Sequence, residues 1–194
     1  MGKILEIKEY ARENHVPIMQ DEGIDFLCNY IKENNIKRIL EIGTAIGYSA
    51  IRFANISNDI MVTTIERDQD RYNEALKNIS ENNLTDRINV ILGDALETTI
   101  DGEYDLIFID AAKSQYIKFF NKYKNNLSKS GVIFSDNLSF HGMVEDITLT
   151  HNRNTRQLVG KIRDYIEFLK NNPEFDTEFY SLGDGISISK RKTQ

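Results

Sequence analysis

Three oxygen-bearing side chains follow two apolar segments of the sequence, each at the point where its segment ends. Asp110 closes the segment Y-D-L-I-F-I-D, and Asp136-Asn137 close G-V-I-F-S-D-N. If the segments are neighbouring parallel strands, as right-handed crossovers of this length usually make them, their ends lie about 4.8 Å apart. Two carboxylates that close repel unless a cation lies between them, and hard oxygen ligands select Mg²⁺, Mn²⁺ or Ca²⁺ over Zn²⁺. These residues therefore predict a divalent-cation site. A helix cap at Asp110 and a turn at Asp136-Asn137 are the plainer alternative.

Lys113 follows Asp110 by three residues and so lies at the mouth of the same predicted site. A lysine beside a metal ion is pushed toward its neutral form by charge repulsion, and a neutral amine can act as a general base. The alternative is a surface lysine, since Lys118, Lys122 and Lys124 follow on the same predicted helix. In combination with the cation site we interpret Lys113 as the candidate base.

A second constellation consists of glycines and acidic residues at three other strand ends. Gly43 and Gly47 stand four apart in E-I-G-T-A-I-G-Y-S, a strand-to-helix turn in which the backbone can approach a ligand closely. Glu66 ends the next strand, where a carboxylate can accept hydrogen bonds from both ribose hydroxyls, and Asp94 follows the third, within reach of an adenine amino group. The glycine spacing is not the G-x-G-x-x-G of dinucleotide sites, and no P-loop lysine follows. The pattern therefore favours an adenosine ligand, and S-adenosylmethionine (SAM) over NAD.

Apolar runs and amphipathic stretches alternate along the chain and must position these residues. The predicted strands are 37–42, 61–66, 88–92, 104–110 and 131–136, followed by a hairpin of 175–181 and 186–190; the predicted helices are 21–34, 68–82, 114–127 and 155–170. Near-continuous apolar strands separated by helices indicate a parallel sheet covered on both faces. The predicted fold is therefore a doubly wound α/β domain whose mostly parallel, seven-stranded sheet ends in an antiparallel hairpin.

Composition narrows the class of protein further. The chain has 194 residues, 40% hydrophobic and 28% charged, which is typical of one globular domain, so residues 1–194 are predicted to form a single domain. No apolar run approaches the roughly 20 residues that cross a bilayer, and no basic stretch followed by an apolar core resembles a signal peptide. A single cysteine favours a reducing, cytoplasmic setting without membrane partners. A net charge of −6 leaves nucleic acid binding to a local basic patch only.

The motifs together resemble one family. I-L-E-I-G-T-A-I-G-Y-S-A, T-I-E-R-D, G-D-A, F-I-D-A-A-K and S-D-N-L-S-F-H-G are similar to the metal-dependent class I SAM O-methyltransferases of the catechol and caffeoyl-CoA group. The resemblance implies a Rossmann-like fold and runs from about Val16 to the final hairpin. Within the group the chain looks most like the bacterial branch that methylates 5-hydroxyuridine in tRNA, and H-V-P-I-M-Q-D-E-G resembles the segment that covers SAM in that branch, so that residues 1–35 would form a helical cover.

The resemblance implies a role for each matching position, and a homodimer. Lys113 would be the catalytic base, Asp110, Asp136 and Asn137 would hold Mg²⁺, and Asp110 would also border the cofactor. The implied SAM contacts are Ile18, Met19, Glu41, Gly43, Ser49, Glu66, Asp94 and Ala95.

Two features of the chain depart from the catechol enzymes. Ala111-Ala112 replace bulky residues between the aspartate and the lysine, and no tryptophan is present to cap a catechol. These departures argue against a catechol-type pocket, and the resemblance to the tRNA branch implies transfer of the SAM methyl group to 5-hydroxyuridine in tRNA, giving 5-methoxyuridine. Phosphates would be held by two clusters of basic residues, one on the predicted helix after Asp110 and one that follows the loop after Asn137: Lys118, Lys122, Lys124, Arg153, Arg156, Lys161 and Arg163.

Other functions stay open beside this one. O-methylation of a small catechol-like phenol is the alternative reaction, because catechol and 5-hydroxyuracil both offer a metal two adjacent oxygens. A SAM-binding regulatory protein without turnover is the non-enzymatic alternative, and a nicotinamide dehydrogenase is disfavoured by the glycine spacing.

Overall fold

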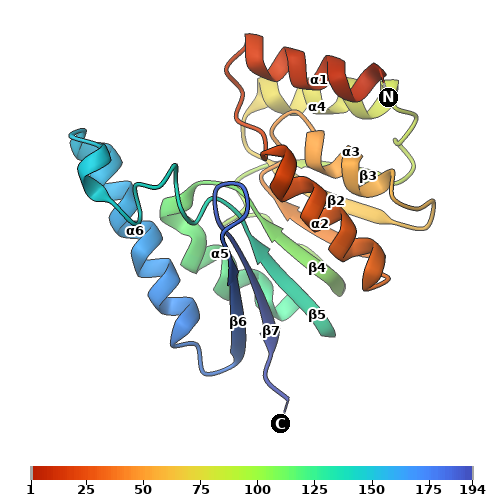
Figure 1. Ribbon diagram of the computed structural model, residues 1–194. Helices are drawn as coiled ribbons and strands as arrows, with labels where there is room; N and C mark the ends of the chain where they lie inside the picture. Colours follow the sequence, from red (N-terminus) through yellow and green to blue (C-terminus); the bar gives the residue numbers. More distant parts are fainter. Residues whose placement is uncertain (1, 194) are drawn as a thin grey trace.

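The computed structural model describes residues 2–193, and its seven strands form one mixed sheet (Figure 1). The strand order is β3-β2-β1-β4-β5-β7-β6. The bounds are β1 Arg38–Ile42, β2 Met61–Glu66, β3 Ile88–Leu92, β4 Tyr104–Ile109, β5 Leu127–Ser135, β6 Phe175–Tyr180 and β7 Ile186–Arg191. β1 to β5 run parallel, and β7 pairs antiparallel with both β5 and β6. The predicted mostly parallel sheet with a terminal hairpin is confirmed.

Helices cover both faces of this sheet. The α-helices are α1 Gly2–Glu13, α2 Asp21–Glu33, α3 Tyr48–Ala54, α4 Gln69–Glu81, α5 Tyr116–Tyr123 and α6 Arg153–Lys170; the 3-10 turns are η1 Lys113–Gln115, η2 Lys124–Asn126 and η3 Ile147–Leu149. α1 to α4 pack on one face, and α5 and α6 pack on the other. Within the described residues, no helix has the length and apolar character needed to cross a membrane.

The sheet separates two hydrophobic cores because successive strand residues point to opposite faces. In β4, Leu106 and Phe108 join the core under α1 to α4, whereas Ile107 and Ile109 join the core under α5 and α6. All four side chains are buried, which explains why the strand reads as an uninterrupted apolar run.

The predicted helix 114–127 is wrong at its C-terminal end. Tyr116, Phe119, Phe120 and Tyr123 are buried on one helical face as expected. Leu127 continues this apolar spacing, but it begins β5 and pairs with Tyr104 after the short η2 turn. The Leu127 side chain can be buried whether its backbone is helical or extended. Apolar spacing alone therefore could not locate the end of the helix.

The direction of strand addition reverses between β1 and β4, which are neighbours although two strands separate them in sequence. Ligands of open α/β sheets bind outside the carboxyl ends of the strands at such a switch point. Gly43 follows β1 and Asp110 follows β4, so the fold brings the two predicted constellations together at this place.

Candidate functional site

A cavity of about 300 Å³ opens beyond the carboxyl ends of β1, β2 and β4, at the switch point. Its walls come from residues 17–19, 42–45, 48–49, 65–67, 71, 93, 95, 110–113 and 137. Seven of the nine positions that the resemblance implies for the cofactor are among them: Ile18, Met19, Gly43, Ser49, Glu66, Ala95 and Asp110. The segment 17–19, between α1 and α2, contributes to the wall from outside the sheet.

The loop between β1 and α3 has a backbone that the glycines make possible. Gly43 and Gly47 have φ of 104° and 82°, and Ala45 also lies in the left-handed region at 47°. The loop is held by its neighbours: the side-chain amide of Asn78 in α4 donates to the Ile46 carbonyl at 2.9 Å. Backbone atoms at residues 43–45 are thereby presented to the cavity.

Glu66 ends β2 and borders the cavity with 7% of its surface exposed. One carboxylate oxygen accepts the backbone N–H of Ala45 at 2.8 Å, and the other accepts those of Arg67 and Asp68 at 3.0 and 2.9 Å. These bonds fix the carboxylate at the strand end. The oxygen that accepts only the Ala45 N–H keeps one accepting position for a ligand hydroxyl, whereas the other oxygen already accepts two hydrogen bonds.

Glu41 is fully buried and does not line the cavity. Its carboxyl group accepts from the Ser49 hydroxyl and, at 2.6 Å, from the Thr64 hydroxyl, so it reaches the cavity wall only through Ser49. Burial raises the pKa of Glu41 to about 8, against the opposing effect of these two hydroxyls. The structure thus places Glu41 behind the residues that a cofactor would touch.

Asp94 is the other implied cofactor residue outside the cavity wall, although its neighbours Gly93 and Ala95 line it. The Asp94 carboxylate accepts the backbone N–H of Leu96 at 2.7 Å and stabilises the turn after β3. Its backbone lies beside the wall between two lining residues, while its side chain is engaged locally.

Asp110, Asp136 and Asn137 meet at the ends of β4 and β5. The register pairs Ile109 with Ser135, so the two aspartates follow at adjacent positions, as the sequence predicted. The Asn137 side-chain amide donates to Asp136 at 2.9 Å and to Asp110 at 3.3 Å, and Asn137 has a left-handed φ of 64°.

Burial raises the pKa of both aspartates, and the charge on Asp110 raises that of Asp136 further. Such a pair is stabilised by a cation. A half-turn about the terminal torsion of Asn137 replaces the amide nitrogen between the carboxylates with the amide oxygen. The donor set then consists of hard oxygen ligands and fits Mg²⁺ or a similar ion. Within residues 2–193, no site is built from three or more His, Cys, Asp or Glu side chains.

Lys113 begins η1 and lines the cavity beside Asp110. Its positive charge partly offsets the burial effect on the Asp110 pKa. The ammonium nitrogen lies 5.7 Å from the ring centroid of Phe140, a cation–π contact that orients the side chain at the cavity mouth. Ala111 and Ala112 separate the aspartate from the lysine and add little bulk to the wall.

The sequence analysis missed Asp184, in the turn between β6 and β7. Asp184 is buried, and one carboxylate oxygen accepts the backbone N–H of His141, while the other lies 3.7 Å from His141 Nδ1. The contact joins the hairpin to the loop after Asn137, in which Phe140 and His141 both have left-handed φ. Gly183-Asp184-Gly185 indicates only a turn, because the partner lies 43 residues away.

Most of the basic residues predicted to hold phosphates are engaged elsewhere. Lys122 donates to the carbonyls of Ala95 and Leu96, Lys124 pairs with Glu174, Lys161 pairs with Asp164, and Arg163 donates to the carbonyl of Val144. Lys118, Arg153 and Arg156 are exposed, without a side-chain hydrogen bond or ion pair to any residue in the range 2–193. The predicted cluster is therefore reduced to these three side chains.

Comparison with known proteins identifies relatives over nearly the whole chain. A family model described as O-methyltransferase matches residues 3–192. Caffeoyl-CoA O-methyltransferase of Populus kitakamiensis is 28% identical, with 95% of this chain and 82% of the relative covered. A Staphylococcus aureus structure, itself assigned only provisionally to caffeoyl-CoA O-methyltransferases, is 43% identical with a TM-score of 0.93, covering 97% and 92% of the two chains. An O-methyltransferase of Bacillus cereus in complex with SAH is 27% identical with a TM-score of 0.83, covering 99% and 91%.

Proposed function

Since the chain belongs to the O-methyltransferase family and is a SAM-dependent O-methyltransferase of the caffeoyl-CoA type, we propose that it acts on a hydroxyl next to a second oxygen. Asp110, Asp136 and Asn137 would hold a divalent cation, which would supply Lewis-acid activation of such an acceptor. The observation that carries this proposal is the convergence of these three side chains beside a cavity that Lys113 also lines.

The residues of the cavity have distinct roles in this proposal. Gly43 and Glu66 hold the nucleoside part of the methyl donor, Glu66 through the free accepting position of the oxygen that also accepts the Ala45 N–H. Methyl transfer from a sulfonium is an in-line displacement, so that positioning and an anionic acceptor oxygen supply most of the catalysis. The aspartates would hold a cation whose charge would lower the pKa of an acceptor hydroxyl. Lys113, in its neutral form, accepts the hydroxyl proton at Nζ.

A small phenol with adjacent oxygens is the acceptor that the relatives favour. The Populus relative is named for caffeoyl-CoA. The engagement of Lys122, Lys124 and Arg163 within the fold favours a free phenol such as catechol, which needs no phosphate-binding surface, unlike the coenzyme A part of caffeoyl-CoA.

Hydroxylated uridine in tRNA is the second candidate, and two observations favour it. Arg153 and Arg156 begin α6, which packs against η1, the turn that starts with Lys113. Ala111-Ala112 and the absence of tryptophan leave the acceptor side without the cap expected for a catechol. A base of an anticodon loop is already single-stranded, so its entry into the cavity costs little.

Methyl transfer from labelled SAM tests the proposal. Catechol, caffeoyl-CoA, 5-hydroxyuridine tRNA and unmodified tRNA are each assayed with Mg²⁺ and with excess EDTA. We expect transfer to at least one acceptor with adjacent oxygens, and its loss in EDTA. Full activity in EDTA would remove the cation from the mechanism, and transfer to monohydroxyl phenols at equal rates would contradict the role of adjacent oxygens.

A further inference from the structure

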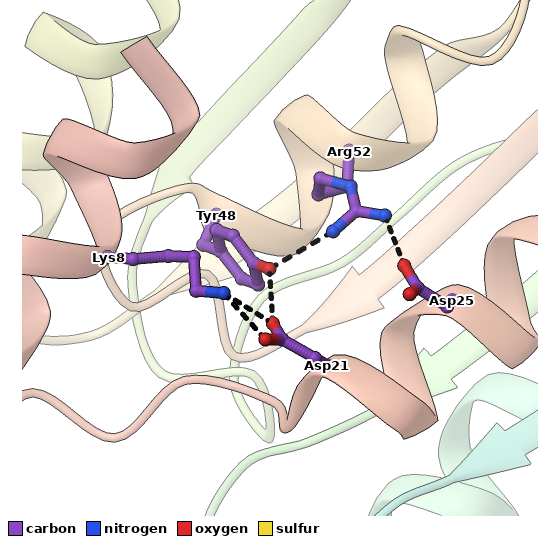
Figure 2. Close-up of polar contacts among 5 residues, drawn as sticks. All are labelled: Lys8, Asp21, Asp25, Tyr48 and Arg52. Atoms are coloured by element: carbon purple, nitrogen blue, oxygen red, sulfur yellow. Dashed lines mark hydrogen bonds and ion pairs between the residues drawn. The ribbon is translucent and has the colours of Figure 1, made fainter. Parts of the chain in front are cut away.

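Five polar side chains from three helices form a continuous network beside the cofactor cavity (Figure 2). Lys8 of α1 contacts both carboxylate oxygens of Asp21, the first residue of α2, at 2.7 Å. The Tyr48 hydroxyl, at the start of α3, lies 3.5 Å from the same carboxylate. Arg52, one turn further along α3, donates to the Tyr48 hydroxyl at 3.1 Å and to Asp25 of α2 at 2.6 Å.

The network joins a peripheral helix to two helices that are fixed in the core. Ile24, Leu27 and Ile31 anchor α2 with no exposed surface. In α1, by contrast, only Ile7 and Ala11 are buried. A local opening of the helices beside the cavity would therefore displace α1 more readily than α2 or α3.

Residues 16–19, which connect α1 to α2, are placed by the helices on either side. Pro17, Ile18 and Met19 line the cavity, while the Val16 N–H donates back to Ala11 of α1 at 2.8 Å. When α1 is held against α2, this segment is held against the cavity. A ligand bound in the cavity would contact this segment, so the position of the segment would affect how the ligand leaves.

The Asp21 carboxylate is also held in place, and its ionised form favoured, by groups other than Lys8. The Tyr48 hydroxyl donates to it, and the positive charge of Arg52, itself satisfied by Asp25, also favours its ionised form. Tyr48 is buried and lines the cavity, so the group that orients Asp21 also borders the ligand. The α2–α3 half of the network does not depend on α1.

We propose that Lys8 is a positioning residue, which through Asp21 holds α1 and residues 16–19 closed over the cofactor cavity. The Lys8–Asp21 pair thereby sets how fast the methyl donor and its demethylated product S-adenosylhomocysteine (SAH) exchange. The inference rests on the proposed use of this cavity for SAM. It concerns exchange of the cofactor, not the acceptor.

The Lys37–Asp59 ion pair provides a matched control. The side chains of Lys8 and Asp21 are 33% and 64% exposed, and those of Lys37 and Asp59 are 35% and 60% exposed. Lys37 precedes β1 and Asp59 precedes β2, so the pair lies at the amino ends of these parallel strands, whereas the cavity lies at their carboxyl ends. Loss of either pair should have a similar effect on stability, whereas only Lys8 is connected to residues 16–19.

The experiment measures SAH release from the full-length protein by stopped-flow displacement. Lys8→Met should increase the release rate about two- to fivefold, the range expected for one partly exposed ion pair. Lys8→Arg should restore the original rate, and Lys37→Met should leave it unchanged. Salt should accelerate release from the unsubstituted protein but not from Lys8→Met, because screening weakens only an existing pair. Unfolding temperatures of the two methionine variants control for stability.

The outcomes separate this inference from the proposed function. Equal release rates for Lys8→Met and Lys37→Met would overturn the role of Lys8 while leaving the cavity as a SAM site. An unsubstituted protein that binds no SAH would contradict both. A protein that binds SAH with the expected Lys8 effect but lacks cation-dependent transfer would contradict only the proposed acceptor chemistry.

Discussion

Gly43 and Asp110 are in backbone contact where the loop between β1 and α3 meets the predicted metal site. A Cβ atom on Gly43 would overlap the Asp110 carbonyl oxygen and stand 2.9 Å from its carbonyl carbon. The Asp110 N–H donates to the Ile42 carbonyl at 3.0 Å, a second backbone contact between the same two segments. The loop after β1 and the loop after β4 therefore form one packed unit. A methyl donor on one and an acceptor on the other would have a fixed relative position.

This contact predicts that Gly43→Ala impairs both halves of the site. The new methyl group meets backbone, and alanine is strained at a φ of 104°, so we expect a loss of stability of about 2 kcal/mol or more. SAM affinity and turnover should fall together as Asp110 shifts. Calorimetric SAM binding and the labelled-methyl assay measure both. Gly160→Ala is the control: it has open space in α6 and should stabilise by up to about 1 kcal/mol. Unchanged SAM binding in Gly43→Ala would refute the coupling.

Asp110→Asn should separate stability from activity. Removing one of two neighbouring carboxylates relieves their repulsion, so the variant should unfold at a higher temperature than the original protein in EDTA. Mg²⁺ should then raise the unfolding temperature of the original protein only, and turnover of the variant should fall at least about 100-fold. Thermal scans with and without Mg²⁺ provide the test, with the exposed Asp101→Asn as the control. A Mg²⁺ shift retained in Asp110→Asn would place the ion elsewhere.

The positions of Asp110 and Asp136 could be predicted because they depend on a general rule. Consecutive parallel strands joined by a right-handed crossover are usually neighbours, and carboxyl ends of parallel strands share one edge. The glycine turn at Gly43 and the strand end at Glu66 follow from the same logic. The glycine turn and the acidic strand end can each be recognised locally, and the order of the strands in the sheet then brings them to one place.

Contacts between distant segments could not be predicted in this way. The buried environment of Glu41 depends on Ser49 and Thr64 closing around it, and the bond of Asp184 to His141 crosses 43 residues. Charge patterning likewise does not reveal which lysines are already paired, as the ion pair of Lys124 with Glu174 shows. These features arise from tertiary packing, for which a single sequence carries no periodic signal.

Glu66→Gln should weaken SAM binding much more than it slows chemistry. Glutamine keeps one acceptor oxygen, which can serve either the Ala45 N–H or the N–H groups of Arg67 and Asp68. It also loses the charge that strengthens hydrogen bonds from ligand hydroxyls. We expect the KM for SAM to rise about 10- to 100-fold, with kcat largely retained, because the nucleoside lies far from the transferring methyl group. Steady-state kinetics at saturating acceptor measure the two constants separately. An unchanged KM would show that the end of β2 does not contact the cofactor.

Glu41 should make the ligand-free protein less stable as the pH rises. In the unfolded chain the carboxyl group ionises near 4.5, whereas burial in the folded protein raises its pKa to about 8. Between these values the unfolded state has lost a proton that the folded state keeps, so stability falls with pH and levels off above about 8. Glu41→Gln should remove a few kcal/mol of this dependence and be more stable than the original protein at pH 8. Urea unfolding at pH 5 and pH 8 tests it, with the exposed Glu103→Gln as the control; parallel pH profiles for the original protein and Glu41→Gln would contradict it.

Arg153 and Arg156 discriminate the two acceptors, because they remain available for phosphate near η1. If tRNA is the substrate, Arg153→Ala and Arg156→Ala should each raise the KM for 5-hydroxyuridine tRNA. Each should also reduce the slope of log binding constant against log salt concentration by about 1, the loss expected for one phosphate contact. SAM binding should be unaffected, since neither residue lines the cavity.

A free phenol such as catechol carries no phosphate group, so its KM should barely respond to salt or to either arginine variant. Lys161→Ala is the matched control on α6, because Lys161 already pairs with Asp164 and should have little effect on either acceptor. Kinetics at about 50 and 200 mM salt, a range over which phosphate contacts change affinity strongly, distinguish the cases. Efficient methylation of catechols with no transfer to 5-hydroxyuridine tRNA at the lower salt would exclude the tRNA reaction and assign the site to small phenols. The reverse result would mean that α6 contributes contacts to the phosphates of tRNA, and it would assign the site to the tRNA reaction.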